Sequence, residues 1–576
     1  MSSDNQPAES YDVAILGGGL AGLTLGLQLK QARPDTSIFI AEKRPGAAPE
    51  AAFKVGESTQ EIACHYFGQV LGLMDHLEND QIRKCGLRFW FSAGDNSVLA
   101  DRVERGPKEH PPVPSWQFDR GRFENFLGEQ CLQAGIDLFG GSFITGVDVA
   151  SDPHTVTIVR GGPGGQESTI KARWVVDASG RNFILKRKLG LLEDNGHMVN
   201  SSWFRLAGGL DLETFADPED DEFMNRMSER GLRQFSTNHL CGKGYWMWLI
   251  PLSSGPISIG VVADPKYHRF DQMDTLEKTL DWIRKHEPQV GAALDGRSDQ
   301  VEDFLKIENF SYGCRQVQSG EDRWSLVGEA GPFLDPFYSP GSDYIAYGNT
   351  LTTDLITRYL DGEDVVDRAA AHNAFFLDVY RTHLTFYEGQ YGFWDNPLVM
   401  NVKIGANNIY YWGFLALLFF NEKLSDLDLM AAMRPDVHRI LAVSRRMEML
   451  FRQWGELEDR EWRRAMVPTQ NFPAMFQRHL DLLERFDDDT IKTRLAANAD
   501  LLEAYAVLAF HRAAANLGDQ APGPDQKINP YAVGLDPALW EVDGLFDGSG
   551  LTLNEARASE SAGMETLYMD AIATPA

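Results

Sequence analysis

The segment of residues 11–42 constrains the fold more strongly than any other part of the chain. An apolar run of strand length, residues 11–16, leads directly into a Gly-x-Gly-x-x-Gly pattern that starts at Gly17, and residues 20–30 follow with helical spacing. A second apolar strand, residues 37–42, ends on Glu42, 25 positions after Gly17 (42 − 17). Such glycines let a pyrophosphate approach the helix N-terminus, and the acid accepts hydrogen bonds from ribose hydroxyls. The pattern predicts a Rossmann-type α/β domain that binds either NAD or FAD.

Two later segments distinguish between these cofactors. Residues 119–127 read Asp-Arg-Gly-Arg-Phe-Glu-Asn-Phe-Leu, and residues 327–331 read Val-Gly-Glu-Ala-Gly. The first is similar to the Arg-x-x-Leu-x-x-x-Leu helix of the p-hydroxybenzoate-hydroxylase-like flavoproteins. The second is similar to their Gly-Asp-Ala segment, with Glu329 in place of the usual Asp. The resemblance implies FAD, with Arg120 at the flavin phosphates and Gly328 and Glu329 beside the ribityl chain.

The same resemblance implies which residues contact FAD. They are Gly17, Gly19, Leu20, Ala21, Gly22, Glu42, Lys43, Ser58, Thr59, Arg120, Gly328, Glu329 and Phe333. Only one dinucleotide fingerprint is visible, so the chain is expected to lack an NAD(P)H domain. A separate NAD(P)H-dependent flavin reductase would then deliver FADH2.

The stretch of residues 243–251, Lys-Gly-Tyr-Trp-Met-Trp-Leu-Ile-Pro, alternates as a β-strand does. Alternation places Trp246 and Trp248 on one face, and Pro251 ends the ladder because proline has no amide hydrogen. Two indoles on one face form a rigid apolar wall that can separate a flavin from an organic substrate. A core strand rich in tryptophan is the alternative, because paired aromatic rings usually indicate packing.

Four places within about the first 350 residues together resemble the flavin-dependent halogenases. The Trp strand contains Trp-x-Trp-x-Ile-Pro, although Tyr245 stands where that family usually has Gly. Residues 333–341 match Phe-x-x-Pro-x-x-Ser-x-Gly in full. Residues 55–59 are similar to Val-Gly-Glu-Ala/Ser-Thr, a loop expected to close over the isoalloxazine, and Lys84 aligns with the family's active-site lysine. Two independent long motifs seldom coincide by chance.

The resemblance implies a reaction in which reduced FAD, O2 and a halide give hypohalous acid. The acid would pass a wall made of Trp246, Trp248, Ile250 and Pro251 and reach Lys84. As an ammonium group, Lys84 would hydrogen-bond and polarise the acid. As a free amine it would form a haloamine, a route that desolvation favours because it lowers the lysine pKa. A surface lysine in a basic stretch is the alternative.

Two departures from the tryptophan halogenases bear on the substrate and the halide. Tyr338 stands where those enzymes have a Glu, so we expect an electron-rich ring that delocalises its own positive charge, such as a phenol, resorcinol or pyrrole. Pro340 has no amide hydrogen, so the amides of Gly341 and Ser342 are expected to bind the halide. Chloride, bromide and iodide all stay open, with a shift toward the larger ions as a hypothesis. The expected catalytic residues are Lys84, Tyr338 and Ser339.

The order of these patterns predicts the fold class: an α/β, Rossmann-type FAD-binding domain interleaved with a substrate-side β-sheet and followed by a mostly helical C-terminal region. Residues 1–350 form the first part, with the substrate-side sheet at about 60–120 and 190–310. Residues 351–520 form the helical region that covers the substrate, and residues 521–576 a loop-rich acidic tail, loosely held from 556. Strands are predicted at 86–91, 155–159, 168–170, 174–180 and 257–263, and helices at 351–360, 439–466 and 500–517. The Gly-rich residues 161–165 open no helix, so they predict a turn and no phosphate site.

The composition excludes several partners. A net charge of −29 repels the phosphates of nucleic acids and anionic lipids, so neither nucleic acid nor membrane is expected as a partner. The five cysteines are scattered and lack metal-ligand spacing, which indicates reduced thiols in a cytoplasmic protein without a metal site. The N-terminus shows no signal pattern. The longest apolar run, residues 409–420, is too short to span a membrane and suits a buried helix or the wall of a substrate pocket.

Other functions and other forms of substrate remain open at this point. An aromatic monooxygenase would need an open path from flavin to substrate, which the Trp wall opposes. A catalytically silent flavoprotein that serves as a binding partner would turn nothing over. The small aromatic substrate is either free or tethered to a carrier protein. Carriers are usually acidic, so docking would need a local basic patch such as residues 186–188.

Overall fold

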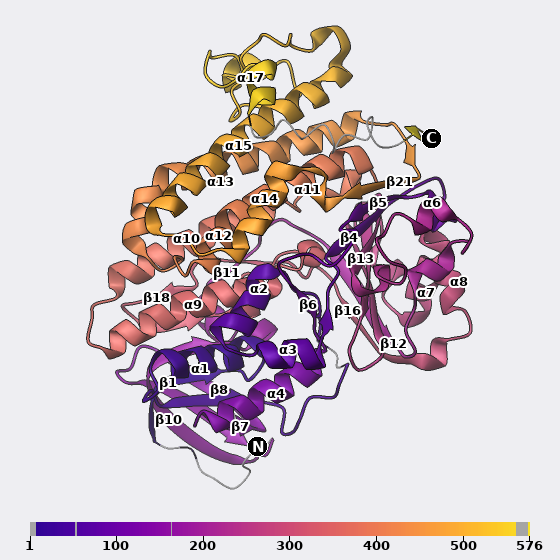
Figure 1. Cartoon of the computed structure of the whole chain (residues 1–576). Helices are drawn as coiled ribbons and strands as arrows, with labels where there is room; N and C mark the ends of the chain where they lie inside the picture. Colours follow the sequence, from indigo (N-terminus) through magenta and orange to yellow (C-terminus); the bar gives the residue numbers. More distant parts are fainter. Residues whose placement is uncertain (1–6, 8, 52–53, 163, 560–573, 576) are drawn as a thin grey trace.

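The computed structural model describes residues 7, 9–51, 54–162, 164–559, 574 and 575. In this part of the chain, two eight-stranded sheets lie beside a block of long helices (Figure 1). The α/β fold with a mostly helical C-terminal region is therefore confirmed.

The first sheet is the dinucleotide-binding sheet that the sequence predicts. Its central strands β10 (Gln166–Asp177), β1 (Ser10–Leu16), β2 (Ile38–Glu42) and β7 (Asp137–Gly140) are parallel and lie in that order. Helix α1 (Leu20–Ala32) connects β1 to β2. Every residue of β2 is buried, as expected for a parallel strand that is covered on both faces. The parallel arrangement brings the carboxyl ends of β1, β2 and β10 to one edge.

Strand β10 is one continuous strand where the sequence predicts two. Its first half pairs antiparallel with β9 (His154–Arg160), which confirms the hairpin, and its second half pairs parallel with β1. No glycine or proline lies between Ser168 and Asp177, so nothing breaks the strand. The two predicted strands at 168–170 and 174–180 are therefore one. Position 163 of the predicted turn lies outside the described residues.

The second sheet is antiparallel for most of its width and carries the Trp strand near its middle. Its strand order is β16-β12-β15-β14-β13-β4-β5-β21. The strands are β16 (Val301–Ile307), β12 (Asn200–Leu206), β15 (Ile257–Ala263), β14 (Tyr245–Pro251), β13 (Thr237–Gly242), β4 (Leu87–Phe91), β5 (Val103–Gly106) and β21 (Ala465–Pro468). The predicted strands at 86–91 and 257–263 are both present. Seven of the eight strands fall inside the two predicted substrate-side ranges, and β21 does not.

The helical region begins earlier and ends differently from the prediction. Helix α9 (Gly341–Leu360) starts at the last residue of the Phe-x-x-Pro-x-x-Ser-x-Gly motif, so the predicted boundary at residue 350 falls within a helix. Helix α13 (Leu427–Leu457) stops before the charged residues 458–461, and Met466 lies in β21. The predicted helix at 439–466 is thus wrong beyond Leu457. Strand β21 pairs parallel with β5, so the backbone groups along this edge of β5 are hydrogen-bonded.

The remaining helices complete the C-terminal region. They are α10 (Val366–Thr385), α11 (Pro397–Tyr410), α12 (Leu417–Phe420), α14 (Pro473–Leu480) and α15 (Asp488–Ala514). The apolar run 409–420 spans the end of α11, a wider turn and α12, and it is buried except at Tyr411. Beyond α15, the short helix α17 (Leu553–Ala558) lies at the top of the view in Figure 1. Most of the predicted loose segment, residues 560–573 and 576, lies outside the described residues.

Three further findings concern membranes, thiols and metals. No described helix is long and apolar enough to cross a bilayer. All five cysteines are buried free thiols. Within the described ranges, no three His, Cys, Asp or Glu side chains are grouped so as to hold a metal ion.

Candidate active site

A cavity of about 950 Å³ opens at the carboxyl edge of the first sheet and extends to the inner face of the second. Its volume lies in the range of cofactor sites. The predicted cofactor residues that line it are Gly17, Gly19, Leu20, Ala21, Glu42, Lys43, Ser58, Arg120, Gly328, Glu329 and Phe333. The other two predicted residues, Gly22 and Thr59, do not line it. We call this space the first cavity.

The turn between β1 and α1 requires glycine for close approach. Gly17 has φ +126°, and a Cβ there would lie 2.4 Å from the Ala178 carbonyl oxygen. Gly22 acts on the same turn from inside α1, since a Cβ would lie 2.0 Å from the Gly17 carbonyl oxygen. Gly22 therefore lets the helix pack against the turn, which explains why it does not line the cavity.

The first turn of α1 offers unpaired amides to the cavity. No side chain caps this helix, and no acid lies in its first turn. Backbone amides at a helix N-terminus bind phosphate well. Glu42 is held beside them, because its carboxylate accepts hydrogen bonds from the amides of Gly18 (3.0 Å) and Arg44 (2.9 Å).

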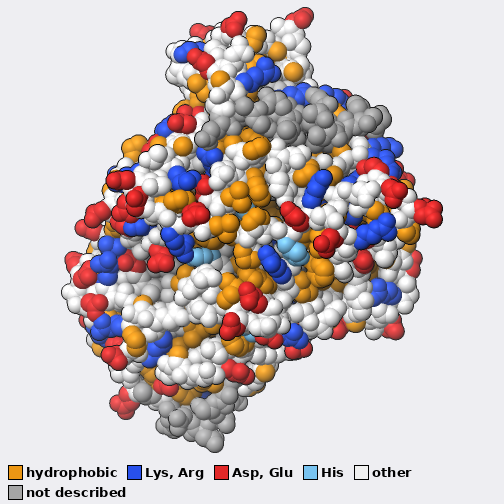
Figure 2. All heavy atoms as spheres, viewed as in Figure 1, with side chains coloured by type: hydrophobic (Ala, Val, Ile, Leu, Met, Phe, Trp, Pro, Cys, Tyr) orange, Lys and Arg blue, Asp and Glu red, His pale blue; other side chains and the backbone are white. Residues whose placement is uncertain are grey.

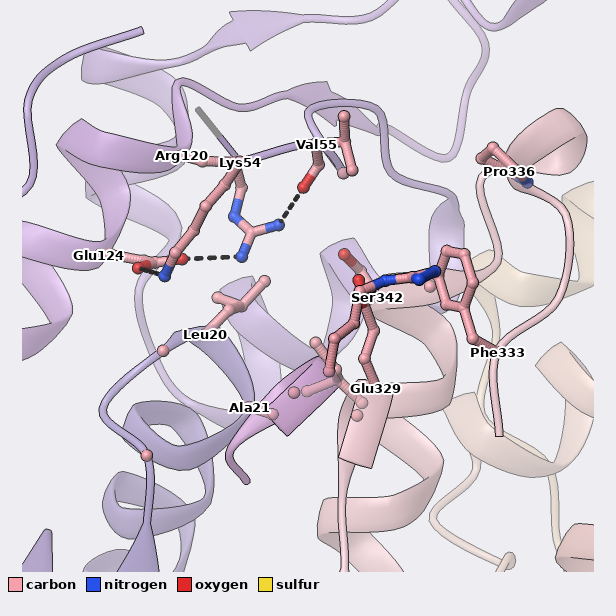
Figure 3. Close-up of a pocket in the computed structure, with 18 of the residues that line it drawn as sticks. Leu20, Ala21, Lys54, Val55, Arg120, Glu124, Glu329, Phe333, Pro336 and Ser342 are labelled. Atoms are coloured by element: carbon pink, nitrogen blue, oxygen red, sulfur yellow. Dashed lines mark hydrogen bonds and ion pairs between the residues drawn. The ribbon is translucent and has the colours of Figure 1, made fainter. Parts of the chain in front are cut away.

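Two positively charged side chains, Lys54 and Arg120, line the cavity near this turn. Arg120, the first residue of helix α4 (Arg120–Gln133), donates to the Val55 carbonyl (2.8 Å) and to Glu124 (2.7 Å), and Lys54 pairs with the same carboxylate (Figure 3). Burial alone would raise the pKa of Glu124, but the charges of Arg120 and Lys54 lower it. Two cations thus share one carboxylate, which leaves positive charge for the phosphates of a dinucleotide. The chain's residues fit FAD.

The Trp strand forms one wall of the first cavity. Trp246, Trp248 and Ile250 line it, and the two indole centroids lie 5.7 Å apart. The predicted alternation is confirmed, because the residues between them pack into the core on the other face of the sheet. The indole N–H of Trp246 donates to the Tyr391 hydroxyl (3.1 Å). Pro251 is the last residue of β14 and does not line the cavity.

A second, smaller cavity of about 70 Å³ lies between the second sheet and the C-terminal helices. Glu61, at the start of helix α2 (Glu61–His65), lines it together with Phe89, Tyr338, Tyr411 and His479. Figure 2 shows hydrophobic side chains gathered in a central band over α2 and α14, the two helices that contribute Glu61 and His479. The run 409–420 supplies both core and cavity wall, since Tyr411 and Trp412 line this space.

Aromatic rings separate the two cavities. Phe89, on the side of the second cavity, stacks on His239, on the side of the first, with centroids 4.8 Å apart. Phe337 contacts both Phe89 (5.2 Å) and Trp246 (5.4 Å). We call this layer the partition. Trp246 of the Trp strand is part of this layer, and rings from three other elements contribute to it.

Two chain segments cross the partition. Ser58 lines the first cavity, whereas Gln60 and Glu61 line the second. Likewise Ser339 lines the first cavity and its neighbour Tyr338 the second. Both motif loops therefore have one end in each cavity.

Lys84 lies in the partition itself. Its side chain is fully buried and lines neither cavity, so it is not a surface lysine. Its ammonium group donates to the Ser58 hydroxyl (2.9 Å) and the Thr59 carbonyl (2.7 Å), and Ser339 donates to the same Ser58 hydroxyl (2.9 Å). Thr59 thus contributes its carbonyl to Lys84. Burial lowers the pKa of Lys84 to about 8, although the negative charge of Glu61 acts in the opposite direction.

Tyr338 and the first residue of α9 belong to the Phe-x-x-Pro-x-x-Ser-x-Gly motif of residues 333–341. The Tyr338 hydroxyl accepts a hydrogen bond from Asn407 (3.3 Å), and burial raises its pKa, so the phenol stays protonated. Ser339 has φ +56° and precedes Pro340, after which α9 begins. Gly341 and Ser342, the residues predicted to bind the halide, are the first residues of this helix, and both line the first cavity.

Sequence reasoning missed two residues at the partition. His239 is fully buried, its Nδ1 lies 3.2 Å from the Arg88 carbonyl, and its Nε2 has no partner among the described residues. Burial lowers its pKa to about 3, which keeps the ring neutral. Glu61 lies 3.6 Å from His479 Nδ1. The only sequence signal for Glu61 is its place two residues after the Val-Gly-Glu-Ser-Thr segment.

The predicted basic patch at residues 186–188 is wrong in its first member. Lys186 is buried, donates to the Gly331 carbonyl and lies over the rings of Phe183 and Tyr312. Only Arg187 and Lys188 are exposed. This segment therefore presents less charge to an acidic carrier than its sequence suggests.

The chain is similar to FAD-binding proteins and to halogenases. Residues 10–275 match the model of the FAD binding domain family. The chain is 27% identical over 382 residues to a flavin-dependent halogenase of Dictyostelium discoideum, a match that covers 61% of each protein. It is 26% identical over 465 residues to a 1H-pyrrole-2-carbonyl-[peptidyl-carrier protein] chlorinase of Pseudomonas fluorescens, covering 76% of this chain and 91% of the relative.

Solved structures agree at the level of the fold. The structure of halogenase PltM in complex with phloroglucinol and FAD aligns with a TM-score of 0.59 at 16% identity, over 86% of this chain and 96% of that one. The chain is thus an FAD-binding-domain protein related to the flavin-dependent halogenases.

Proposed function

We propose that the chain is an FADH2- and O2-dependent halogenase of an electron-rich aromatic compound, supplied with FADH2 by a separate reductase. The observation that carries this proposal is the position of Lys84, buried in the partition and bonded to a loop that reaches both cavities. An aromatic hydroxylase would need its substrate beside the flavin, and the partition opposes that. The pyrrole and phloroglucinol in the names of the two relatives support an electron-rich ring.

The first cavity would hold the cofactor and the halide. Arg120, Lys54 and the first amides of α1 bind the phosphates, and the amides of Gly341 and Ser342 bind the halide. When bound, reduced FAD supplies hypohalous acid from O2, a halide ion and a proton, with water and oxidised flavin as the other products. The Trp wall keeps the organic substrate out of this space.

Lys84 would then activate the acid for the ring. Two hydrogens of its ammonium group are bonded to Ser58 and Thr59, so the third is free to donate to the oxygen of hypohalous acid. The ring carbon takes the halogen, and the O–X bond breaks. The departing hydroxide takes a proton from Lys84 and becomes water. Glu61 accepts the ring proton and returns it to Lys84, the carboxylate role that Tyr338 cannot fill.

Product analysis tests the function directly. The protein is supplied with FAD, a flavin reductase, NADH and O2, and is given a panel of phenols and pyrroles with chloride, bromide or iodide. Mass spectrometry should show one halogen in the product and no product when halide is omitted. Hydroxylated products that form without halide would replace this proposal with a monooxygenase. No turnover of any panel member would favour a silent flavoprotein.

The pH dependence distinguishes the two roles of Lys84. With a pKa of about 8, the lysine is about 90% ammonium at pH 7. If the ammonium group polarises the acid, the rate should fall as the pH rises through 8, by about tenfold per pH unit above it. A rate that instead rises through pH 8 would overturn this route and support the haloamine.

The variant Glu61→Gln tests the link between the carboxylate and the lysine. Loss of the negative charge should lower the Lys84 pKa further and move the alkaline limb of the pH profile down by roughly half to one unit. Glu109→Gln, an exposed acid on a nearby loop, serves as the control and should leave the limb in place. An unmoved limb in Glu61→Gln would remove Glu61 from the mechanism.

A further inference from the structure

Among the buried arginines in and beside the second sheet, one has no acidic partner within the described part of the chain. Five arginines in the described part of the chain are less than 2% exposed. Four form ion pairs: Arg88 and Arg233 with Glu104, Arg102 with Glu287, and Arg205 with Asp303. The fifth is Arg105 in β5, and no described carboxylate lies within 4.0 Å of its guanidinium group.

Arg105 lines the second cavity, on the substrate side of the partition. Its Nη1 donates to Asn401 (3.0 Å), which fixes the guanidinium group. Its Nη2 is buried and has no hydrogen-bond partner among the described residues. Gln470, in the wall of the same cavity, likewise has a buried amide oxygen without a described partner. The wall of this cavity therefore includes one buried donor and one buried acceptor that have no hydrogen-bond partner among the described residues.

An unpaired buried cation is unfavourable for the protein alone. Burial lowers the pKa of Arg105 to about 10, yet the group remains charged at neutral pH. Sheets that bury arginine normally supply a carboxylate, as the four neighbours do, because an isolated charge in an apolar interior loses its hydration. A ligand that brings a carboxylate would supply the missing partner and match the planar fork of the guanidinium group.

We infer that the second cavity binds a one-ring aromatic carboxylate and that Arg105 forms the ion pair with its carboxyl group. This rests on the proposed function, since it names the class of compound that the halogenase would accept. The small volume of the cavity excludes compounds of more than one ring, and its walls must move apart to admit one. A ring acid tethered to a carrier has lost its carboxylate to the thioester and offers Arg105 no charge, so the substrate is the free acid.

Binding is measured without reduced flavin, so the result is independent of whether halogenation occurs. Isothermal titration calorimetry compares 4-hydroxybenzoate with 4-hydroxybenzamide, and pyrrole-2-carboxylate with pyrrole-2-carboxamide. At least one acid should bind ten times or more tightly than its amide. The inference is overturned if both acids bind no more tightly than their amides, whatever the products of the full reaction.

Substitutions then assign the preference to Arg105. Arg105→Gln should reduce the ratio between acid and amide to within twofold, and Arg105→Lys, which keeps the charge, should retain most of it. Lys108→Gln removes an exposed charge three positions away and should leave the ratio unchanged. An acid preference that survives intact in Arg105→Gln would overturn the assignment. Should that variant not fold, the comparison of acids and amides in the unmodified protein still decides the inference.

Discussion

Replacement of Lys84 by methionine should abolish halogenation while FAD still binds. The ammonium group is the only part of the side chain that can donate to hypohalous acid, and general acid groups of this kind contribute up to about 10⁴-fold in rate. We expect a loss of at least about 10³-fold in product formation by mass spectrometry. FAD affinity, measured by titration, should change little, because Lys84 does not line the first cavity.

The same substitution should not destabilise the protein. A loss of activity can therefore be assigned to the missing ammonium group and not to unfolding. Burial lowers the Lys84 pKa from 10.5 to about 8, a penalty of about 3 kcal/mol at pH 7 that methionine does not incur. Loss of the hydrogen bonds to Ser58 and Thr59 offsets about 2 kcal/mol of this gain.

The penalty on Lys84 also has a pH signature. The unfolded chain holds this proton up to about pH 10.5 and the folded chain only to about pH 8, so the penalty is complete below pH 8 and fades between these values. The stability advantage of Lys84→Met should shrink over that window. Arg83→Met, an exposed neighbour, is the control and should keep full activity. Near-normal halogenation by Lys84→Met would remove the lysine from the mechanism.

Substitution of Gly17 by alanine should weaken FAD binding strongly and lower the temperature at which the first sheet unfolds. The residue has φ +126°, where L side chains are strained by about 1–3 kcal/mol, and the new Cβ would lie 2.4 Å from the Ala178 carbonyl oxygen. Neither the backbone strain nor the close contact can relax without separating β1 from β10, since the Ala178 amide also donates to the Leu16 carbonyl. We expect FAD affinity to fall more than about 100-fold and stability to fall by more than about 3 kcal/mol.

Gly46→Ala is the matched control for this experiment. Gly46 is exposed, lies on the loop after β2, and a Cβ there would meet nothing within 4 Å. Its thermal unfolding and FAD titration should match those of the unmodified chain. If Gly17→Ala bound FAD as tightly as Gly46→Ala, the turn would not be the phosphate site.

Features with a short sequence period were predictable. Alternation along one strand placed Trp246 and Trp248 on the same face, and the spacing from Gly17 to Glu42 placed the two ends of a βαβ unit at one edge of a sheet. These inferences depend on backbone geometry that repeats every two residues, or on a motif contained in about 30 residues. Neither requires knowledge of how distant segments pack.

The contents of the second cavity were not predictable in this way. Glu61, Arg105 and His479 come from three elements that are far apart in sequence, and only tertiary packing brings them around one space. Arg105 resembles any charged residue in an exposed strand. Its significance comes from the lack of a carboxylate nearby, which no sequence pattern expresses. The helix prediction beyond Leu457 failed for the same reason, since pairing with β5 decided the conformation of residues 465–468.

The pairing of β21 with β5 has a consequence for how new specificities arise in such proteins. Arg105 and Val467 are partners in that ladder, so the helical half of the molecule is joined to the wall of the second cavity by backbone hydrogen bonds. Domain shuffling that exchanged the helices alone would leave β5 as an unpaired edge strand, and such an edge promotes aggregation. Diversity in this architecture is therefore expected to come from point changes around the second cavity, with the helices and the sheet inherited together.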